Sequence, residues 1–326
     1  MNLPGTGRLR RAEAYGRGAV DGFRFCRVPD HQYARARIRA RGSAFAYATS
    51  ALFALLAIIW FLAARGDQPA YRRASRLFVT GTAMFAAVMA ATAVVPAEIR
   101  VLAWGLTGAA YLAGFTAVIA TATPVQAAAL TITDALIERF GLLIIFVLGE
   151  TVTGVVDGLA HTSIDALSVI VALVAVMAGF GAWWTYFDFA GHRPPRPERP
   201  HSLLWILTHL PLTAAIAAMG AAMVSLVEHA HANHTATATA WGLSGSAALV
   251  LAATALPTIS LQVWREQPRL YRPLARLCAA VAVVCLGLGI TRPTPLIFGL
   301  LLVGLFSIPW LFAVTHRVTH QDSPSP

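Results

Sequence analysis

The sequence lacks lysine altogether. All 25 of its basic residues are arginine, against 15 Asp and Glu, so the net charge is +10. The arginines gather in the N-terminal stretch and in short segments between long apolar runs, as the positive-inside rule describes for cytoplasmic parts of membrane proteins. The excess positive charge is therefore explained without nucleic acid, and we expect no nucleic-acid partner.

Cysteine is also scarce, with only Cys26, Cys278 and Cys285. The last two stand seven residues apart in one predicted helix, roughly 10 Å along its axis, which is too far for a disulfide. No CxxC pair or Cys/His ligand set occurs, and P-loop, GxGxxG, GxSxG and HExxH patterns are missing from any usable context. These absences argue against a nucleotide-driven or soluble-type catalytic domain, and we predict no cofactor, metal site or catalytic residue.

Charged residues are few, at 12%, whereas hydrophobic residues make up 57% and the mean hydropathy is +0.64. A soluble domain carries about twice that charge fraction. The sequence therefore predicts an all-α, polytopic transmembrane helix bundle. Its nine predicted spans are residues 43–64, 77–95, 101–122, 136–156, 166–188, 203–227, 240–262, 274–291 and 295–314. The eighth is the shortest, and we expect it to begin at Pro273.

The two ends of the chain differ from this pattern. Residues 1–42 hold ten arginines and no apolar run, so we predict a basic tail or irregular segment without a cleavable signal peptide. Residues 43–315 are the predicted transmembrane domain, and residues 316–326 form a short polar tail.

Loop arginines predict the orientation of the chain. Segments 190–202 and 263–273 carry three arginines each, whereas 157–165 and 228–239 carry none. The first two segments are expected in the cytoplasm, and so is the C-terminus. An odd number of spans then places the arginine-rich tail outside, against the same rule. Either residues 43–64 do not span simply, or upstream helices are missing and residues 1–42 are not a normal part of the fold. We favour the second interpretation.

The fourth predicted span carries charges within an apolar segment. At 100° per residue, Arg139, Glu150 and Asp157 fall within about 20° of one another on one stripe of the helix. A charge in lipid costs roughly 2.5–3.5 kcal/mol, so we expect this stripe to face protein or water. Glu138 is most simply an interfacial charge, and small residues such as Gly149-xxx-Thr153 allow close helix contact.

Glu150 is the most informative of these charges. It lies about 16 Å along the axis from Arg139, too far for contact. Three interpretations are open: hydrogen bonds from hydroxyls at similar depth (Ser50, Tyr111 or Ser246), a carboxyl held neutral by burial, or exposure to a water-filled cavity. Such a carboxyl is a candidate proton or cation site. The alternative is a neutral residue that joins helices by hydrogen bonding.

Two further residues complete the predicted polar interior. Asp188 ends the fifth span at a depth similar to that of Arg139, so we expect an ion pair between them, either a gate or a structural staple. His209 precedes Pro211, which removes a backbone donor and frees carbonyl groups that could line a cavity. His209 is then either a proton relay or a hydrogen-bonded packing residue. The histidine cluster within residues 228–234 is interpreted as a polar loop rather than a metal site.

Four short motifs resemble one known family. Glu138-Arg139-Phe140-Gly141-Leu142, Leu148-Gly149-Glu150, Trp184-xx-Phe187-Asp188 and His209-Leu210-Pro211-Leu212 are similar in order and spacing to the bacterial low temperature requirement A (LtrA) family. The resemblance covers roughly residues 43–315. It implies a multi-spanning protein of the bacterial inner membrane, linked to growth in the cold, in a family without an established molecular activity. Two differences stand out: the family's opening helix with an FFDLVF-like motif is missing, and Ala135 stands where the family often has His.

Three functions follow as hypotheses. The first is transport of a small solute or ion, with or without proton coupling, in which Glu150 is the carrier and Arg139 and Asp188 form a gate. The second is a membrane-embedded enzyme that acts on a lipid or isoprenoid, and the third is a sensory or scaffold protein of the envelope. We favour transport over catalysis. Membrane lipid and an unidentified small solute or ion are the expected partners, and the sequence is compatible with an oligomer.

Overall fold

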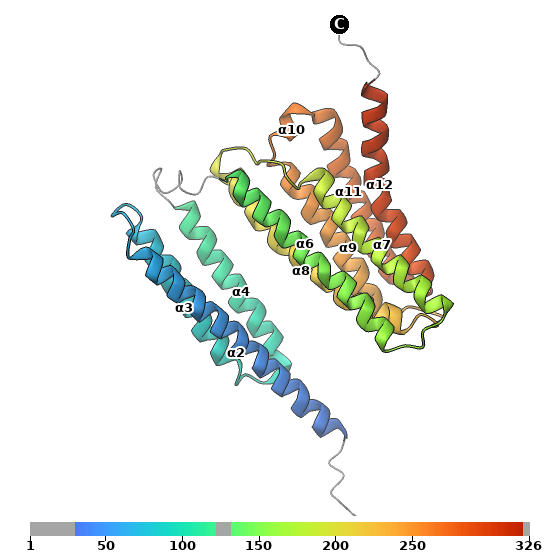
Figure 1. Cartoon of the computed structure of the whole chain (residues 1–326), viewed down its shortest axis with the longest axis horizontal. Helices are drawn as coiled ribbons and strands as arrows, with labels where there is room; N and C mark the ends of the chain where they lie inside the picture. Colours follow the sequence, from blue (N-terminus) through green and yellow to red (C-terminus); the bar gives the residue numbers. More distant parts are fainter. Residues whose placement is uncertain (1–29, 122–131, 322–326) are drawn as a thin grey trace, which may run out of the picture. The chain divides into compact units, whose positions relative to one another are not determined.

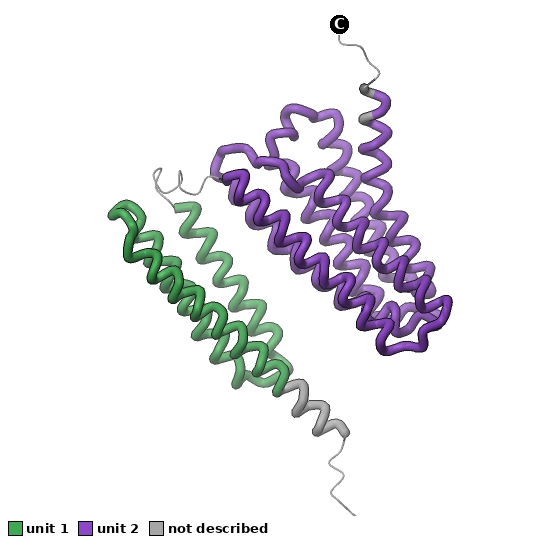
Figure 2. The backbone as a smooth tube through the Cα atoms, viewed as in Figure 1, with its two compact units in different colours: residues 1–126 green, residues 127–326 purple. Residues whose placement is uncertain are grey.

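The computed structural model describes the backbone of residues 30–121 and 132–321, and the side chains of residues 40–121, 132–316, 318 and 319. This part of the chain is helical, without a β-strand. It contains nine helices that are long and apolar enough to span a membrane. The predicted all-α bundle with about nine spans is therefore confirmed for the described residues. The chain divides into two compact units, residues 1–126 and 127–326 (Figure 2).

The first unit contains three described helices, α2 (Asp30–Ala64), α3 (Arg72–Thr92) and α4 (Ala97–Ala120) (Figure 1). The helix α3 packs against both α2 and α4. Three rings join the helices, because Phe85 lies 4.3 Å from Phe53 and 4.9 Å from Tyr111 between ring centroids.

The start of α2 differs from the predicted boundary at residue 43. This helix begins at Asp30, so residues 30–42 are helical rather than irregular. The segment is rich in alanine and arginine, which are among the strongest helix formers. Local propensity therefore extends the helix beyond its apolar part.

The second unit contains seven helices among its described residues. They are α6 (Asp134–Ala160), α7 (Ala166–Phe189), α8 (Arg199–Glu228), α9 (Thr237–Thr258), the short α10 (Val263–Glu266), α11 (Pro268–Thr291) and α12 (Pro295–Gln321). The helix α9 is the most buried of them and packs against α8, α11 and α7. The helix α6 packs against α8, and α12 packs against α7.

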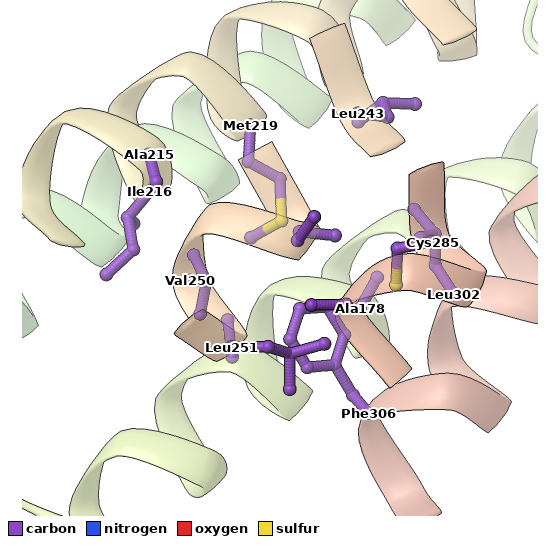
Figure 3. Packing of buried hydrophobic residues seen from close by; sticks show 14 of the residues in the cluster. Ala178, Ala215, Ile216, Met219, Leu243, Val250, Leu251, Cys285, Leu302 and Phe306 are labelled. Atoms are coloured by element: carbon purple, nitrogen blue, oxygen red, sulfur yellow. The ribbon is translucent and has the colours of Figure 1, made fainter. Parts of the chain in front are cut away.

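Apolar side chains from α8, α9, α11 and α12 meet in the core of this unit. Met219, Leu251, Cys285 and Phe306 lie together there (Figure 3). Cys278 and Cys285 are free and buried, in keeping with their interpretation as small apolar residues. Cys26 lies outside the described residues.

Local sequence signals decide where the helices begin. The Asp165 carboxylate accepts the Ser168 N–H at 2.8 Å, and the Ser168 hydroxyl accepts the Asp165 N–H at 3.0 Å, which is a capping box at the start of α7. The prediction that the eighth span begins at Pro273 is wrong. The helix α11 begins at Pro268 and continues through Pro273. Proline is favoured at the first position of a helix because its missing N–H needs no partner there.

The helices α6 and α8 approach each other closely through glycine. A Cβ atom on Gly220 would lie 2.7 Å from a carbonyl oxygen of α6, and one on Gly158 would lie 2.8 Å from a carbonyl oxygen of α8. A Cβ atom on Gly154 would collide with the Gly220 carbonyl. The expected contact at Gly149-xxx-Thr153 is not formed within this unit, since both residues are exposed and no described neighbour lies within 4 Å of a Cβ built on Gly149.

Candidate functional site

The three charges of the predicted stripe lie on the exposed face of α6 in the second unit. Arg139, Glu150 and Asp157 are all exposed, as is Glu138 beside them. Phe146 shares this face and is 78% exposed. Among the described residues, no hydrogen bond or ion pair reaches the side chain of Arg139 or Glu150. Within its own unit, this stripe is therefore not part of the interior.

Asp188 lies at the end of α7 and is half-buried. Its carboxylate accepts a hydrogen bond from the indole N–H of Trp184 at 3.3 Å, one turn earlier in the same helix. No ion pair joins it to Arg139 in the part of the chain whose side chains are described. The expected ion pair between Arg139 and Asp188 is therefore not formed among the described side chains.

His209 is the predicted site residue that the structure buries, with 3% of its surface exposed. Its Nδ1 atom lies 2.7 Å from the backbone oxygen of Trp205, one turn earlier in α8. Its Nε2 atom lies 2.9 Å from the hydroxyl of Tyr186 on α7. The rings of Phe140 and Trp205 flank the imidazole, with centroid distances of 4.6 Å and 4.4 Å.

These contacts determine the tautomer of the neutral imidazole. A carbonyl oxygen can only accept, so Nδ1 carries the hydrogen and Nε2 accepts the hydroxyl hydrogen of Tyr186. A proton added to Nε2 turns both ring nitrogens into donors. The hydroxyl of Tyr186 must then accept from His209 and direct its own hydrogen elsewhere. A change in the protonation of His209 therefore disturbs the contact between α7 and α8.

The sequence places this pair through two helix periodicities. Buried residues of α8 recur at steps of three and four, from Trp205 through His209 to Leu212, which makes one stripe of the helix face the core. On α7, Tyr186 follows Ala182, which is also buried. A methyl side chain one turn before Tyr186 leaves room for its ring between the helices.

The loop between α7 and α8 is fastened to the loop after α9. The guanidinium Nη2 of Arg196 donates to the Ile259 carbonyl at 2.6 Å, and its backbone N–H donates to the Ser260 carbonyl at 2.8 Å. Arg193 donates to the backbone carbonyl of Asp188 at 3.2 Å. These arginines satisfy carbonyl groups at the ends of α9 and α7, and they hold in place the end of the bundle that contains Tyr186 and His209.

Tyr186 is the site residue that sequence reasoning missed. It stands near the end of a span among Trp183, Trp184 and Phe187, where aromatic residues commonly anchor a helix at the membrane surface. The structure buries its ring, which is 1% exposed. Its burial could have been predicted from its position one turn after Ala182, on the side of α7 that carries small residues.

The histidine cluster predicted as a polar loop contacts the opposite loop of the same unit. His231 Nε2 lies 2.6 Å from the carboxylate of Asp165. His161 Nδ1 lies 3.6 Å from the carboxylate of Asp157 and 4.0 Å from that of Glu228. Among the described residues, no three His, Cys, Asp or Glu side chains form a group that could hold a metal ion.

Two of these loop residues have shifted pKa values. The pKa of His161 is raised, first by a hydrogen bond to the backbone carbonyl of Asp157 and then by the Asp157 carboxylate. The pKa of Asp165 is lowered, first by the hydrogen bond from the backbone N–H of Ser168, with a smaller contribution from His231. Both groups are therefore charged more readily in the folded protein than in a free chain.

Two hollows are found outside the neighbourhood of His209. A groove of about 560 Å³ runs between α3 and α4, and a depression of about 190 Å³ lies between α7 and α12. None of the residues that line them belongs to the predicted site. Around Pro211, α8 continues as a helix.

The fold and the distribution of polar groups define a polytopic membrane protein with a histidine–tyrosine pair buried in one of its two units. The family model of the bacterial low temperature requirement A protein (LtrA) matches residues 33–307. The chain therefore belongs to the LtrA family, and the resemblance seen in its motifs is confirmed. Comparisons with curated proteins and with solved structures give no match.

Proposed function

We propose that this LtrA-family protein transports a small solute or ion across the bacterial inner membrane, and that transport is coupled to protonation of His209. The supporting observation is the buried hydrogen bond between Tyr186 and His209. Ionisable residues within membrane spans are rare and commonly mark ion pathways or proton relays. In this proposal, the C-terminus lies in the cytoplasm, as the loop arginines predict.

The pair couples a proton to helix packing. Tyr186 belongs to α7 and His209 to α8, so their hydrogen bond joins two spans. When His209 gains a proton, the Tyr186 hydroxyl loses its acceptor and must find another. A buried polar group without a partner costs about 1–3 kcal/mol, which is enough to shift a balance between two helix arrangements by about tenfold. Alternating access requires a shift of this kind.

Further polar groups are buried in the same unit. Ser244 and Thr254 of α9 are buried, and their hydroxyl groups have no hydrogen-bond partner among the described residues. Most buried hydroxyl groups in proteins are satisfied. Unused hydrogen-bonding capacity on the central helix provides points at which a passing solute or ion could be bound.

The proposal is tested with proton movement as the probe. The purified full chain is reconstituted in liposomes that contain pyranine, and a potassium gradient with valinomycin drives proton entry. We expect entry above that of empty liposomes, a decrease of at least about tenfold in His209→Gln, and a smaller decrease in Tyr186→Phe. Cys278→Ala serves as the control, because it also changes one buried side chain of the same unit but lies outside the pair.

Two results would reject different parts of the proposal. Equal proton entry in the wild-type protein and in folded His209→Gln would reject His209 as the coupling group. The assay is repeated with Na⁺ and with K⁺ as the transported ion. If neither protons nor these ions enter faster than in empty liposomes, ion transport is rejected. Gel filtration and tryptophan fluorescence of each variant show whether it is folded.

The enzyme hypothesis has less support. A lipid-modifying enzyme needs an acid, base or nucleophile beside an apolar cleft. The groove between α3 and α4 has the size of a small-molecule site. Its lining includes Tyr111, Thr80 and Thr107, but no carboxylate, histidine or cysteine.

A further inference from the structure

We infer that the exposed face of α11 is a binding surface for an anionic phospholipid. Arg269, Arg272 and Arg276 lie at steps of three and four, and all three are exposed. At 100° per residue they fall within about 60° of one another on the helix. They therefore form one stripe of positive charge, here called the arginine stripe.

The arginine stripe has no internal counter-charge. The sequence of α11 contains no Asp or Glu, and no ion pair of these arginines is found among the described side chains. Arg276 instead directs its Nε toward the backbone carbonyl of Arg272 at 3.3 Å, back toward the start of the helix. Its guanidinium thus points along the helix toward the level of the other two, as a snorkelling side chain does.

An apolar surface continues directly from the arginine stripe. Ala280, Val283, Gly287 and Ile290 follow at the same helical spacing. Val283 is 68% exposed and Ile290 is 70% exposed. Gly287 has no described neighbour within 4 Å of the position that a Cβ would take. With small residues at 280 and 287, this part of the face is a shallow apolar track.

The arrangement matches the two halves of a phospholipid. Arg269 and Arg276 are seven residues apart, which is about 10 Å along the axis, a distance comparable to the headgroup region and the first part of the hydrocarbon. Guanidinium groups bind phosphate through paired hydrogen bonds. A lipid phosphate at the arginine stripe would place an acyl chain along the apolar track, and an anionic headgroup complements the uncompensated charge.

The experiment measures lipid retention by native mass spectrometry. The purified full chain is released from detergent after titration with dioleoyl-phosphatidylglycerol or with dioleoyl-phosphatidylcholine, which have the same acyl chains. We expect the wild-type protein to retain more phosphatidylglycerol than phosphatidylcholine. An arginine near a membrane surface contributes about fivefold to binding of an anionic lipid, so the triple variant R269Q/R272Q/R276Q should lose most of the preference.

Matched variants separate the arginine stripe from net charge. R65Q/R73Q/R76Q removes three exposed arginines of the first unit, and we expect it to retain the preference. R269K/R272K/R276K keeps the positive charge and should retain part of the preference for phosphatidylglycerol. This variant also provides the test if the glutamine variant fails to fold. Equal retention of the two lipids by wild-type protein, or equal losses in the two glutamine triples, would overturn the inference.

A competition experiment identifies the source of the phosphate. Inorganic phosphate at millimolar concentration shares the headgroup charge but has no acyl chain. We expect it to leave phosphatidylglycerol bound, because the apolar track contributes to retention. Displacement of the lipid by free phosphate would show a simple anion site and overturn the assignment to phospholipid.

Discussion

The hydroxyl of Tyr186 donates a hydrogen bond to Nε2 of His209 across 2.9 Å, inside the second unit of the protein. The other nitrogen of the ring donates to the Trp205 carbonyl at 2.7 Å. Both ring nitrogens are therefore satisfied by the neutral imidazole and by one tautomer of it. This arrangement makes His209 sensitive to the loss of a single partner.

Replacing Tyr186 with phenylalanine removes that partner without changing the shape of the ring. The buried Nε2 atom of His209 is then left without a donor, which should destabilise the protein by about 1–3 kcal/mol. Thermal unfolding in detergent measures the effect. Tyr47→Phe is the control, since Tyr47 is 55% exposed, and it should change the melting temperature little. Equal melting temperatures for Tyr186→Phe and the wild-type protein would show that the hydrogen bond contributes nothing to stability.

The crossing of α6 and α8 predicts opposite effects for two glycine substitutions. Gly220→Ala forces a methyl group against the α6 backbone and should cost about 1–3 kcal/mol through overpacking. Gly149→Ala meets no described neighbour and should stabilise α6 by up to about 1 kcal/mol, because alanine favours the helix. Urea unfolding monitored by circular dichroism compares the two. Equal unfolding free energies for Gly220→Ala and Gly149→Ala would show that α6 and α8 do not pack closely at Gly220.

The loop between α6 and α7 should respond to pH through His161 and Asp165. The pKa of His161 is raised above its ordinary value of 6.5, so its contribution to stability is complete below that value and is lost as the pH rises through the folded-state pKa. The pKa of Asp165 is lowered below 3.8, so its contribution is complete above that value and is lost only as the pH falls through the folded-state pKa.

Both contributions are therefore present together at mildly acidic pH. We expect the melting temperature of the wild-type protein to be higher at about pH 5.5 than at about pH 8, and His161→Gln to reduce this difference. His234→Gln changes an exposed histidine of the facing loop and should leave the difference intact. If His161→Gln shows the same difference in melting temperature as the wild-type protein, His161 does not cause the pH dependence.

The separation of Arg139 from Asp188 makes a prediction about additivity. Because no ion pair joins them among the described side chains, the effects of Arg139→Gln and Asp188→Asn on unfolding free energy should add within about 0.5 kcal/mol in the double variant. Chemical unfolding of the four proteins of the cycle provides the measurement. A coupling energy well above that limit would indicate that the two charges meet after all.

Glu150 provides a test of the carrier hypothesis that is independent of His209. Its side chain is exposed on α6, one turn after the exposed ring of Phe146. If it carries the proton, Glu150→Gln should reduce pH-driven flux in liposomes by at least about tenfold, whereas Glu138→Gln, at the start of the same helix, should reduce it far less. Unchanged flux in Glu150→Gln would reject its assignment as carrier.

Much of the fold could be predicted from sequence because membrane spans are encoded locally. A run of about 20 apolar residues is enough to identify a span, and each predicted span matches one helix of the structure. The errors lie at helix ends, for example at residues 30–42 of α2 and at Pro268 of α11. There, helix propensity and proline placement extend a helix past the apolar run. The LtrA motifs were equally local, and the family match confirms them.

The amino-acid sequence alone determined the spans that lie within the described residues, the family, and the positions of Arg139, Glu150, Asp188 and His209 along those spans. Only the tertiary structure decided what each of them faces. Depth along a helix follows from counting residues, whereas the rotation of a helix about its axis depends on how its neighbours pack against it. That rotation turned Gly154 rather than Gly149 toward α8, and left Glu150 on the exposed face of its unit. It also brought Tyr186, rather than a charged residue, to His209.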